Sequence, residues 1–270
     1  DSDGLVDPSD VKKAITDRTT LISIMHGNNE IGTVQPIAEI GAIAREHGIT
    51  FHTDAVQTFG RLPIDVNALN VDLLSASGHK IYGPKGVGFL YVRKGTNIRS
   101  FMHGGDQERG RRASTHNVPG IVGMGKAAEL AMKDLDVEMD RLTTLRNRMI
   151  RGILGNIDQS RLNGHPTRRL PNNVNTSIDY VEGESLLLLL DMEGIACSTG
   201  SACSSSDLEP SHVLIAIGLP HETAHGSLRF SLGRQTEEED VEYVVGALQG
   251  IVKRLRAMSP LCKGKNQAIA

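Results

Sequence analysis

The chain has 270 residues and a formal net charge of -3, and this length allows a sizeable hydrophobic core in one large or two smaller domains. The small net charge gives no electrostatic reason to expect a nucleic-acid partner, and no lysine and arginine cluster is interleaved with aromatic residues. The longest apolar run, Leu186–Leu190, is far shorter than the roughly 20 residues of a membrane-spanning helix. We therefore expect neither nucleic acid nor membrane as a partner.

The amino-terminal half alternates short apolar runs with helical patterns. Ile37, Ile40 and Ile43 recur at helical spacing after Pro36, and Gly48 ends the pattern. Short strands separated by helices predict an α/β fold with a largely parallel sheet. The predicted strands cover residues 20–25, 49–53, 71–76 and 87–92.

From about residue 135 the pattern changes to one long amphipathic helix followed by shorter elements of both kinds, which predicts a second, α+β domain. The expected divisions are a large domain at 1–134, a linking helix at 135–162, a small carboxy-terminal domain at 163–259 and a tail at 260–270. In the small domain, the predicted strands are 173–178, 195–197 and 227–231, and the predicted helices are 183–192, 210–217 and 237–258.

Asp54 and Lys80 follow the second and third predicted strands. An acid at a strand end can keep a pyridinium nitrogen protonated, and a lysine on a short polar loop can form a Schiff base with an aldehyde. The pair therefore suggests a pyridoxal phosphate site, although an Asp after a strand is more often a helix cap and a lysine is more often a solvated surface residue. Asn29 and Ser77 also lie just past strand ends, where open parallel sheets bind ligands.

Cys203 lies in the polar, glycine-containing stretch Ser198–Ser205, where a thiol can act as a nucleophile. Cys197 ends an apolar run and is better interpreted as a buried small side chain. The spacing of these cysteines with His212 and His225 misses that of structural zinc sites, so we expect no metal. Three cysteines, an odd number, indicate free thiols in a reducing compartment, which we expect to be the cytosol.

Taken together, these motifs resemble the cysteine desulfurases, the pyridoxal phosphate enzymes that take sulfur from L-cysteine for iron–sulfur cluster assembly, in their housekeeping and nitrogen-fixation branch. The resemblance implies pyridoxal-phosphate fold type I. It also implies an amino-terminal part ahead of residue 1, with the cofactor's phosphate loop and ring-stacking histidine. The matching segments are Ser23–Gly32, His52–Gln57, Ser75–Lys80, Gly104–Gly110, Ser198–Ser205 with Leu208–His212, and Arg229–Arg234.

By this resemblance, Lys80 and Cys203 are the catalytic residues. Lys80 would hold the cofactor and move the Cα proton of L-cysteine. Cys203 would take the substrate sulfur as a persulfide, leave L-alanine, and pass the sulfur to an iron–sulfur scaffold protein. Arg229 would hold the substrate carboxylate in a bidentate pair, with a structural salt bridge as the alternative role.

The same resemblance implies a set of residues that bind the pyridoxal 5'-phosphate. Thr115 would reach the phosphate of the other subunit's cofactor, so a homodimer would complete each site. The others are Asp54 at the pyridinium nitrogen, Gln57 and Asn29 near the phenolic oxygen, with Asn29 also near the substrate carboxylate, and Ser77 and His79 at the phosphate.

Two alternatives stay open: another pyridoxal enzyme of fold type I, such as an aminotransferase or a selenocysteine lyase, and an inactive truncated fragment. The Cys203 segment argues against transamination, which needs no thiol. The expected absence of the amino-terminal part favours the fragment, with weak cofactor retention and negligible sulfide production. The chain also departs from the family at Asp106 and Ser114, where glycines are usual and a side chain restricts φ.

Overall fold

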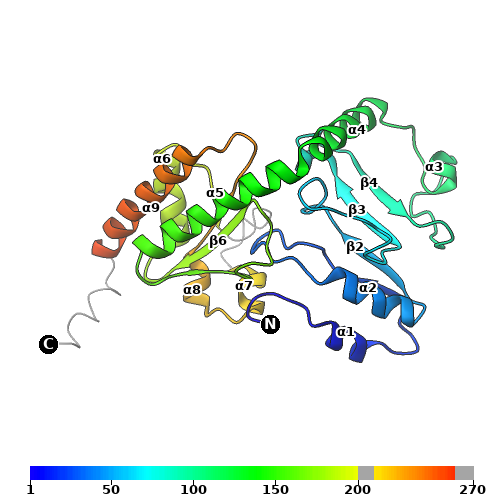
Figure 1. Cartoon of the computed structure of the whole chain (residues 1–270), viewed down its shortest axis with the longest axis horizontal. Helices are drawn as coiled ribbons and strands as arrows, with labels where there is room; N and C mark the ends of the chain where they lie inside the picture. The colour runs from blue at the N-terminus through cyan, green and yellow to red at the C-terminus, as the bar shows by residue number, and fades with distance from the viewer. Residues whose placement is uncertain (200–209, 259–270) are drawn as a thin grey trace. The chain divides into compact units, whose positions relative to one another are not determined.

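A computed structural model describes residues 1–199 and 210–258 of the chain (Figure 1). The chain forms two compact units. The sheet unit comprises residues 6–27 and 35–135, and the carboxy-terminal unit comprises residues 1–5, residues 28–34 and the described residues from 136 onward. The domain boundaries expected after residues 134, 162 and 259 stay predictions. The short excursion of residues 28–34 into the carboxy-terminal unit is a feature that no sequence pattern indicated.

The sheet unit is built on four strands in the order β1-β2-β3-β4. β1, β2 and β3 run parallel to one another, and β4 runs antiparallel to β3. This arrangement confirms the predicted α/β fold with a largely parallel sheet, and each strand overlaps one of the predicted runs. The strands are β1 (Leu21–Ser23), β2 (Thr50–Asp54), β3 (Leu73–Ser77) and β4 (Gly88–Val92).

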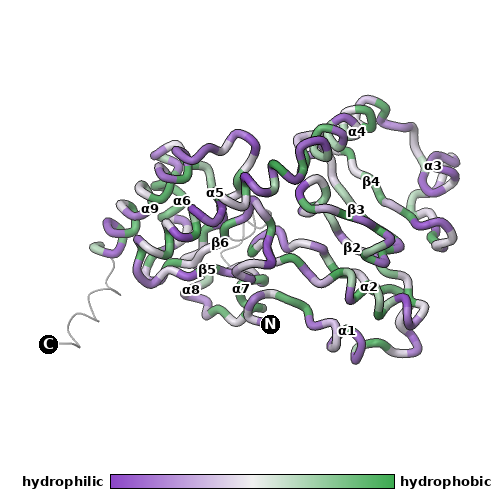
Figure 2. Tube along the Cα trace, viewed as in Figure 1, coloured by the Kyte–Doolittle hydropathy of each residue, from purple (hydrophilic) through white to green (hydrophobic). Residues whose placement is uncertain are grey.

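Helix α2 (Ile37–Glu46) packs its apolar side against the sheet. Ile37, Ile40 and Ala44 of α2 are buried with Phe51 of β2, and Gly48 adopts a φ of +64° just past the helix end. This left-handed conformation is one that glycine tolerates at a helix terminus. In Figure 2 hydrophobic and hydrophilic residues alternate along α2, as an amphipathic helix requires. The remaining elements are α1 (Pro8–Ala14), the 3₁₀ turn η1 (Gly78–Ile81), α3 (Gln107–Gly110) and α4 (Val118–Lys133).

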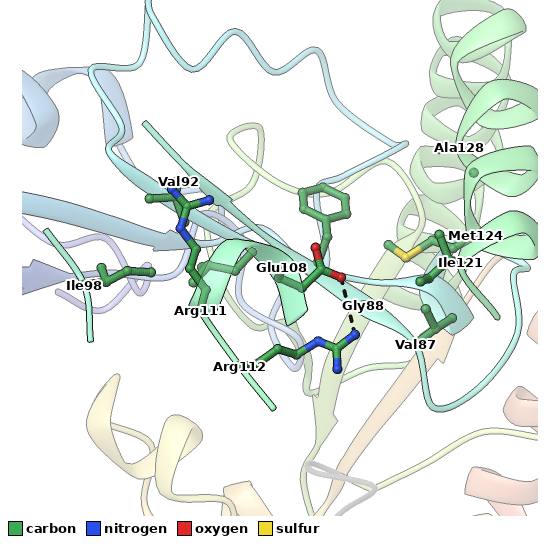
Figure 3. Close-up of a pocket in the computed structure, with 13 residues that line it drawn as sticks. Val87, Gly88, Val92, Ile98, Glu108, Arg111, Arg112, Ile121, Met124 and Ala128 are labelled. Carbon is green, nitrogen blue, oxygen red and sulfur yellow. Dashed lines mark hydrogen bonds and ion pairs between the residues drawn. The ribbon is translucent and has the colours of Figure 1, made fainter. Parts of the chain in front are cut away.

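A cavity of about 590 Å³ lies between β4 and α4 in the sheet unit (Figure 3). Its walls are mainly apolar, and Arg112 at its rim forms an ion pair with Glu108 at 3.4 Å. None of the residues predicted for the cofactor lines this cavity. The apolar lining includes Phe89 and Leu90 of β4 and Ile121 of α4, which are 38%, 48% and 45% exposed.

β4 is also an edge strand among the described residues, because β3 is its only neighbour there. The antiparallel ladder to β3 uses every second residue of β4. The backbone groups of Gly88, Leu90 and Val92 therefore point away from β3, as the flanking bonds from Gly78 to Val87 and from Arg93 to Asp72 indicate. An exposed apolar edge of this kind is a template for pairing with another chain.

The carboxy-terminal unit has an antiparallel sheet in the order β5-β6-β7. Strands β6 and β7 and helices α5, α6 and α9 contribute to one hydrophobic core, and Ile31 packs with residues of α7 and α8 in a second, smaller one. The predicted strands 173–178 and 227–231 and the predicted helix 183–192 are confirmed with the same bounds. The elements are α5 (Leu135–Asn156), β5 (Ser160–Leu162), β6 (Asn173–Ile178), α6 (Gly183–Met192), α7 (His212–Ala216), α8 (His221–His225), β7 (Ser227–Ser231) and α9 (Glu238–Met258).

The prediction of a strand at 195–197 was wrong. The backbone there forms only an isolated antiparallel bridge, between Ser198 and Arg229 of β7. The bridge lies at Ser198, just past the predicted run, and residues 195–197 pack through their side chains instead: Ile195 is buried, and Cys197 contacts the core of the unit.

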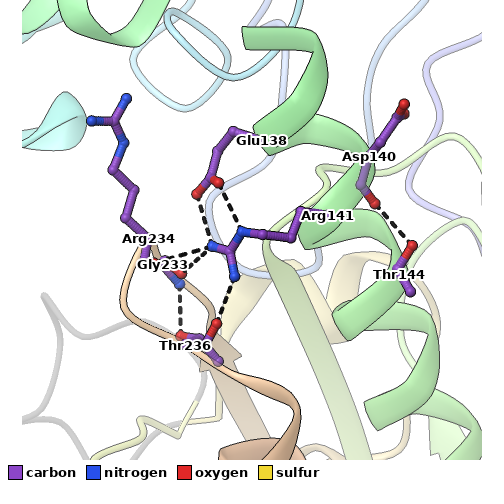
Figure 4. Close-up of polar contacts among 7 residues, drawn as sticks. All are labelled: Glu138, Asp140, Arg141, Thr144, Gly233, Arg234 and Thr236. Atoms are coloured by element: carbon purple, nitrogen blue, oxygen red, sulfur yellow. Dashed lines mark hydrogen bonds and ion pairs between the residues drawn. The ribbon is translucent and has the colours of Figure 1, made fainter. Parts of the chain in front are cut away.

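Arg141 of α5 holds the loop that follows β7 (Figure 4). Its guanidinium forms an ion pair with Glu138 at 2.8 Å and donates to the carbonyls of Gly233 and Thr236 at 3.0 and 2.6 Å. The contact fixes the carboxyl end of the strand that carries Arg229.

Within both described stretches, no helix combines the length and apolar composition that crossing a bilayer requires.

His26 is a buried polar residue that joins neighbouring segments of the sheet unit. Its backbone N–H donates to the Asp54 carbonyl at 2.8 Å, and its carbonyl accepts from the Gln35 N–H at 2.9 Å. Its ring Nδ1 lies 3.0 Å from the Thr58 hydroxyl. Burial lowers the pKa of His26 from 6.5 to about 4, so the folded chain holds this ring neutral at physiological pH.

We expect the free energy of unfolding to fall as the pH drops from 6.5 to about 4. The pKa of His26 is lower in the folded chain than in the unfolded chain, so between these two pH values the unfolded chain binds a proton that the folded chain does not. The stabilisation is therefore complete above pH 6.5 and is lost below it, and the free energy of unfolding falls by up to about 3 kcal/mol. Urea midpoints at pH 7.5 and 5 would measure this loss. His26→Gln should reduce the difference, and the exposed His47→Gln should leave it unchanged. An equal pH dependence in His26→Gln and the parent chain would contradict the assignment.

We expect the exposed edge of β4 to cause concentration-dependent aggregation of the purified chain. Leu90→Lys places a charge on this edge and should suppress the aggregation, as lysines do on natural edge strands. Leu188→Lys is the matched control, because Leu188 is 67% exposed on α6, away from any sheet edge. Light scattering over a concentration series would measure the effect, and equal scattering from the two variants would show that β4 is not the cause.

Candidate active site

The carboxyl ends of β2 and β3 bring together four of the residues predicted for the cofactor. Asp54 ends β2 and lies opposite Ser75 of the parallel strand β3. Ser77 ends β3, and His79 and Lys80 follow at once in η1. These side chains therefore lie at one edge of two adjacent parallel strands, where open α/β sheets bind their ligands.

Asp54 is exposed, and one of its carboxylate oxygens accepts a hydrogen bond from the Val56 N–H at 2.8 Å. This is an Asx-turn bond and not the helix cap that was the alternative explanation, because no helix lies in the described residues 55–72 between β2 and β3. It uses Oδ1 only, so the bond is compatible with a second partner at the other carboxylate oxygen. Gln57 lies half-buried in the turn that follows.

Ser77 and His79 form a hydrogen-bonded pair, with Ser77 Oγ 2.8 Å from His79 Nδ1. When the hydroxyl donates this bond, the imidazole carries its proton on Nε2 and presents a donor on its far side. His79 is exposed. A hydroxyl and an imidazole N–H are suitable donors for an anionic oxygen, and both lie within three residues of Lys80.

The turn that carries Lys80 is held from two sides. The Lys80 carbonyl accepts from Arg61 Nη2 at 2.8 Å, and Tyr82 ends the turn with a φ of +64°. Gly78 is favoured at its start, because a Cβ there would make tight contacts, 3.0 Å from the Val87 side chain and 3.1 Å from the Pro84 carbonyl. The lysine side chain itself is half-buried.

His52 connects the first three strands beneath this edge. Its sequence position, two residues before Asp54, does not indicate this role. Its Nδ1 lies 2.8 Å from the Ser23 hydroxyl, and its Nε2 lies 2.8 Å from the Ser75 hydroxyl. Burial lowers the pKa of His52, although the nearby Asp54 carboxylate opposes the shift. The ring thus fixes the spacing of the strands that end in the predicted cofactor residues.

Thr115 lies in an exposed stretch of the sheet unit, next to the departure from the family pattern at Ser114. Ser114 has a φ of +80°, a left-handed conformation that is easier for glycine. Arg112 Nη1 donates to the carbonyls of Ala113 and Ser114 at 2.9 and 2.6 Å, which supports this backbone. At Asp106 the φ is -96°, so the side chain there meets no such restriction.

Arg229 and Asn29 lie together in the carboxy-terminal unit. Arg229 Nη1 donates to the Asn29 carbonyl at 3.1 Å, and Nη2 donates to Ser198 Oγ at 3.4 Å. The buried Nε has no partner in the described parts of the chain. All these acceptors are neutral, and no carboxylate in residues 1–199 or 210–258 pairs with Arg229. The alternative role as a structural salt bridge therefore has no support there.

The predicted nucleophile, Cys203, lies outside the described residues. Cys197 is half-buried against the core, and burial, with the Asp191 carboxylate adding to the effect, raises the pKa of its thiol to about 11. At that pKa roughly one thiol in a thousand is ionised at pH 8. Cys197 is therefore a poor nucleophile at physiological pH.

Residues 1–244 match the aminotransferase class-V family. The chain is 59% identical over 260 residues to the cysteine desulfurase IscS of Dictyoglomus turgidum, a match that covers 96% of this chain and 66% of that protein. It is 60% identical over 261 residues to the cysteine desulfurase IscS of Methanosarcina thermophila, with coverage of 97% and 64%. The chain thus spans slightly less than two thirds of the length of these relatives.

Two solved structures have the same fold. A NifS-like protein is 37% identical with a TM-score of 0.85, and the match covers 93% of this chain and 66% of that one. A NifS-like protein from Rickettsia africae is 31% identical with a TM-score of 0.85, and the match covers 94% and 68%.

Proposed function

The chain belongs to the class-V aminotransferase family, and we propose that it acts in a pyridoxal phosphate-dependent cysteine desulfurase that converts L-cysteine to L-alanine. The observation that carries the proposal is the grouping of Asp54, Ser77, His79 and Lys80 at the carboxyl ends of β2 and β3. The fold is pyridoxal-phosphate fold type I, as in the NifS-like structures. The identity of 59% to a cysteine desulfurase supports the choice of reaction within the family.

The residues at the strand ends fit pyridoxal phosphate. An exposed carboxylate at Asp54 suits a pyridinium nitrogen, and the Ser77 and His79 pair supplies donors for a phosphate. Lys80, between these groups and Arg61, is the residue to attach the cofactor aldehyde. When bound, the cofactor withdraws electrons from the substrate Cα and makes its proton acidic.

Further contacts to the cofactor complete the proposed site. Gln57 and Asn29 would bind the phenolic oxygen, and Thr115 would bind the phosphate in the opposite subunit. The exposure of Thr115 is compatible with a contact to a second chain. A homodimer is therefore part of the proposal.

The proposed reaction assigns one task to each of three side chains. The Lys80 amine accepts the Cα proton of L-cysteine and returns a proton to the product. Arg229 holds the substrate carboxylate, a charge that its neutral partners leave unbalanced. The Cys203 thiolate forms a sulfur–sulfur bond with the substrate as the bond from the substrate sulfur to Cβ breaks, so Cys203 keeps a persulfide and L-alanine remains.

The sulfur acceptor that we propose is an iron–sulfur scaffold protein. The thiol chemistry requires a reducing compartment, and we propose the cytosol. The second candidate function is transamination, which the name of the family favours. It requires the same lysine and arginine and no thiol, so the cysteine variants below separate the two.

Cys203→Ala should abolish persulfide formation on the cofactor-loaded protein, and Cys197→Ala should retain it, because the raised pKa keeps the Cys197 thiol protonated. Mass spectrometry after incubation with L-cysteine would locate the extra sulfur. A persulfide on Cys197 or Cys262 would show that the nucleophile is misassigned. Full turnover of an amino acid by Cys203→Ala, with no sulfide released by the parent, would favour transamination.

Arg229→Ala should lower kcat/KM for L-cysteine about 10–100-fold, since a hydrogen bond to a charged group contributes about 1.5–3 kcal/mol. Arg229→Lys should restore little of this loss, because an ammonium group cannot form the bidentate pair. Arg141→Ala is the folding control, since it removes an arginine of the same unit that bonds the loop after β7. An unchanged kcat/KM in Arg229→Ala would assign Arg229 a structural role.

A further inference from the structure

The segment that carries Asn29 is bound to the carboxy-terminal unit through its carbonyl groups. The Asn29 carbonyl accepts from Arg229 Nη1 at 3.1 Å. The next carbonyl, that of Glu30, accepts from the side-chain amides of Asn173 and Asn175 at 3.0 and 3.1 Å. Asn175 lies directly opposite Arg229 in the β6–β7 ladder, so one cross-strand pair holds two consecutive residues of the segment.

The Glu30 side chain makes a contact of its own. It is only 1% exposed, and its Oε2 accepts a hydrogen bond from the Ser211 hydroxyl. Ser211 Oγ in turn accepts from the N–H groups of Val213 and Leu214 at 3.2 and 3.3 Å, as the N-cap of α7. A buried carboxylate is costly unless it is hydrogen-bonded, so the pairing with Ser211 stabilises both groups. The proposed reaction gives Glu30 no task.

Ser211 and Ser198 lie on the two sides of residues 200–209. Ser198 exchanges backbone hydrogen bonds with Arg229 at 2.7 and 3.2 Å, and its hydroxyl accepts from Arg229 Nη2 at 3.4 Å. Ser211 is bonded to Glu30, the neighbour of the residue whose carbonyl Arg229 holds. Both attachment points are therefore tied to one connected set of groups around Arg229.

We infer that Glu30 is a positioning residue that couples Arg229 to the carboxy-terminal attachment of the segment bearing Cys203, through Ser211. The inference rests on the proposed function. Sulfur transfer requires the thiol to reach a substrate whose carboxylate is held at Arg229. Reaction rates fall steeply when reacting groups are displaced by about 1 Å. A fixed connection between Arg229 and Ser211 should therefore raise the rate of sulfur transfer and leave substrate binding largely unchanged.

Four variants test the role of the side chain. Glu30→Ala removes the acceptor and leaves the Ser211 cap intact, whereas Glu30→Gln keeps an oxygen acceptor for the hydroxyl. Ser211→Ala breaks the same bond from the other side and serves if Glu30→Ala does not fold. Arg141→Ala is the matched control, because its bonds to the carbonyls of Gly233 and Thr236 hold the loop after β7 and involve neither Glu30 nor Ser211.

Hydrogen exchange measures the connection without cofactor or turnover. Glu30→Ala and Ser211→Ala should speed exchange about tenfold in peptides that cover residues 28–34 and 210–217, the size expected for one hydrogen bond to a charged group. Glu30→Gln should retain most of the protection. Arg141→Ala should leave both peptides protected. Unchanged exchange in Glu30→Ala and Ser211→Ala would overturn the inference.

Kinetics then distinguish positioning from general loosening. In the cofactor-loaded protein, Glu30→Ala should lower kcat for sulfide release about tenfold with KM changed less than about twofold, because Arg229 keeps its own partners. Glu30→Gln should recover most of the lost kcat. A rise in KM that matches the fall in kcat would contradict the inference. Absence of sulfide release from the parent chain would favour the inactive fragment over the proposed activity, and hydrogen exchange would still decide the role of Glu30.

Discussion

The hydrogen bonds from Arg229, Asn173 and Asn175 to two consecutive carbonyls, those of Asn29 and Glu30, are the constraint on which the carboxy-terminal unit depends. They hold residues 28–34 as part of this unit, although the chain on either side belongs to the sheet unit. Backbone carbonyls buried without partners would cost free energy comparable to lost hydrogen bonds. The side chains of β6 and β7 therefore supply donors that a neighbouring strand would otherwise provide.

The composition of β6 follows from this demand. All six of its residues are buried, yet it contains two asparagines, a threonine and a serine. Asn163 Nδ2 donates to Asn175 Oδ1 and Ser177 Oγ, both at 2.8 Å, which orients the Asn175 amide toward Glu30. Arg169 donates to the Ile31 carbonyl at 3.1 Å, and burial, with the charge of Arg146 adding to the effect, lowers its pKa to about 10. A strand of valines and leucines would bury more apolar surface and leave these carbonyls unpaired.

The proposed chemistry also depends on which charged side chains already have a partner of opposite charge. Arg229 keeps neutral acceptors, so its charge remains available to a carboxylate, whereas Arg141 already pairs with Glu138 and serves the fold. Packing against the core keeps the Cys197 thiol protonated, a state that suits a structural side chain and disfavours attack on sulfur.

The local sequence pattern predicted the secondary structure correctly where hydrophobic periodicity and turn residues indicated the same element. It predicted β6, β7 and α6 with their bounds, a largely parallel sheet, and the position of Asp54 and Lys80 near the carboxyl ends of two strands, where Asp54 is the last residue of β2. It failed at 195–197, where an apolar run packs against the core and the backbone pairs only at Ser198, just past the run. For these elements the sequence itself determined the structure, because side-chain period and chain reversal are properties of neighbouring residues.

Only the tertiary structure decided which distant groups meet. Glu30 and Ser211 are separated by 181 positions, and Arg229 and Asn29 by 200, so no spacing in the sequence relates them. The burial of His26 and the left-handed φ of Ser114 likewise depend on the surrounding fold rather than on local preference. A buried polar group is satisfied by whatever donor or acceptor the packing of the chain brings within about 3 Å, and that choice is made only when the units have folded.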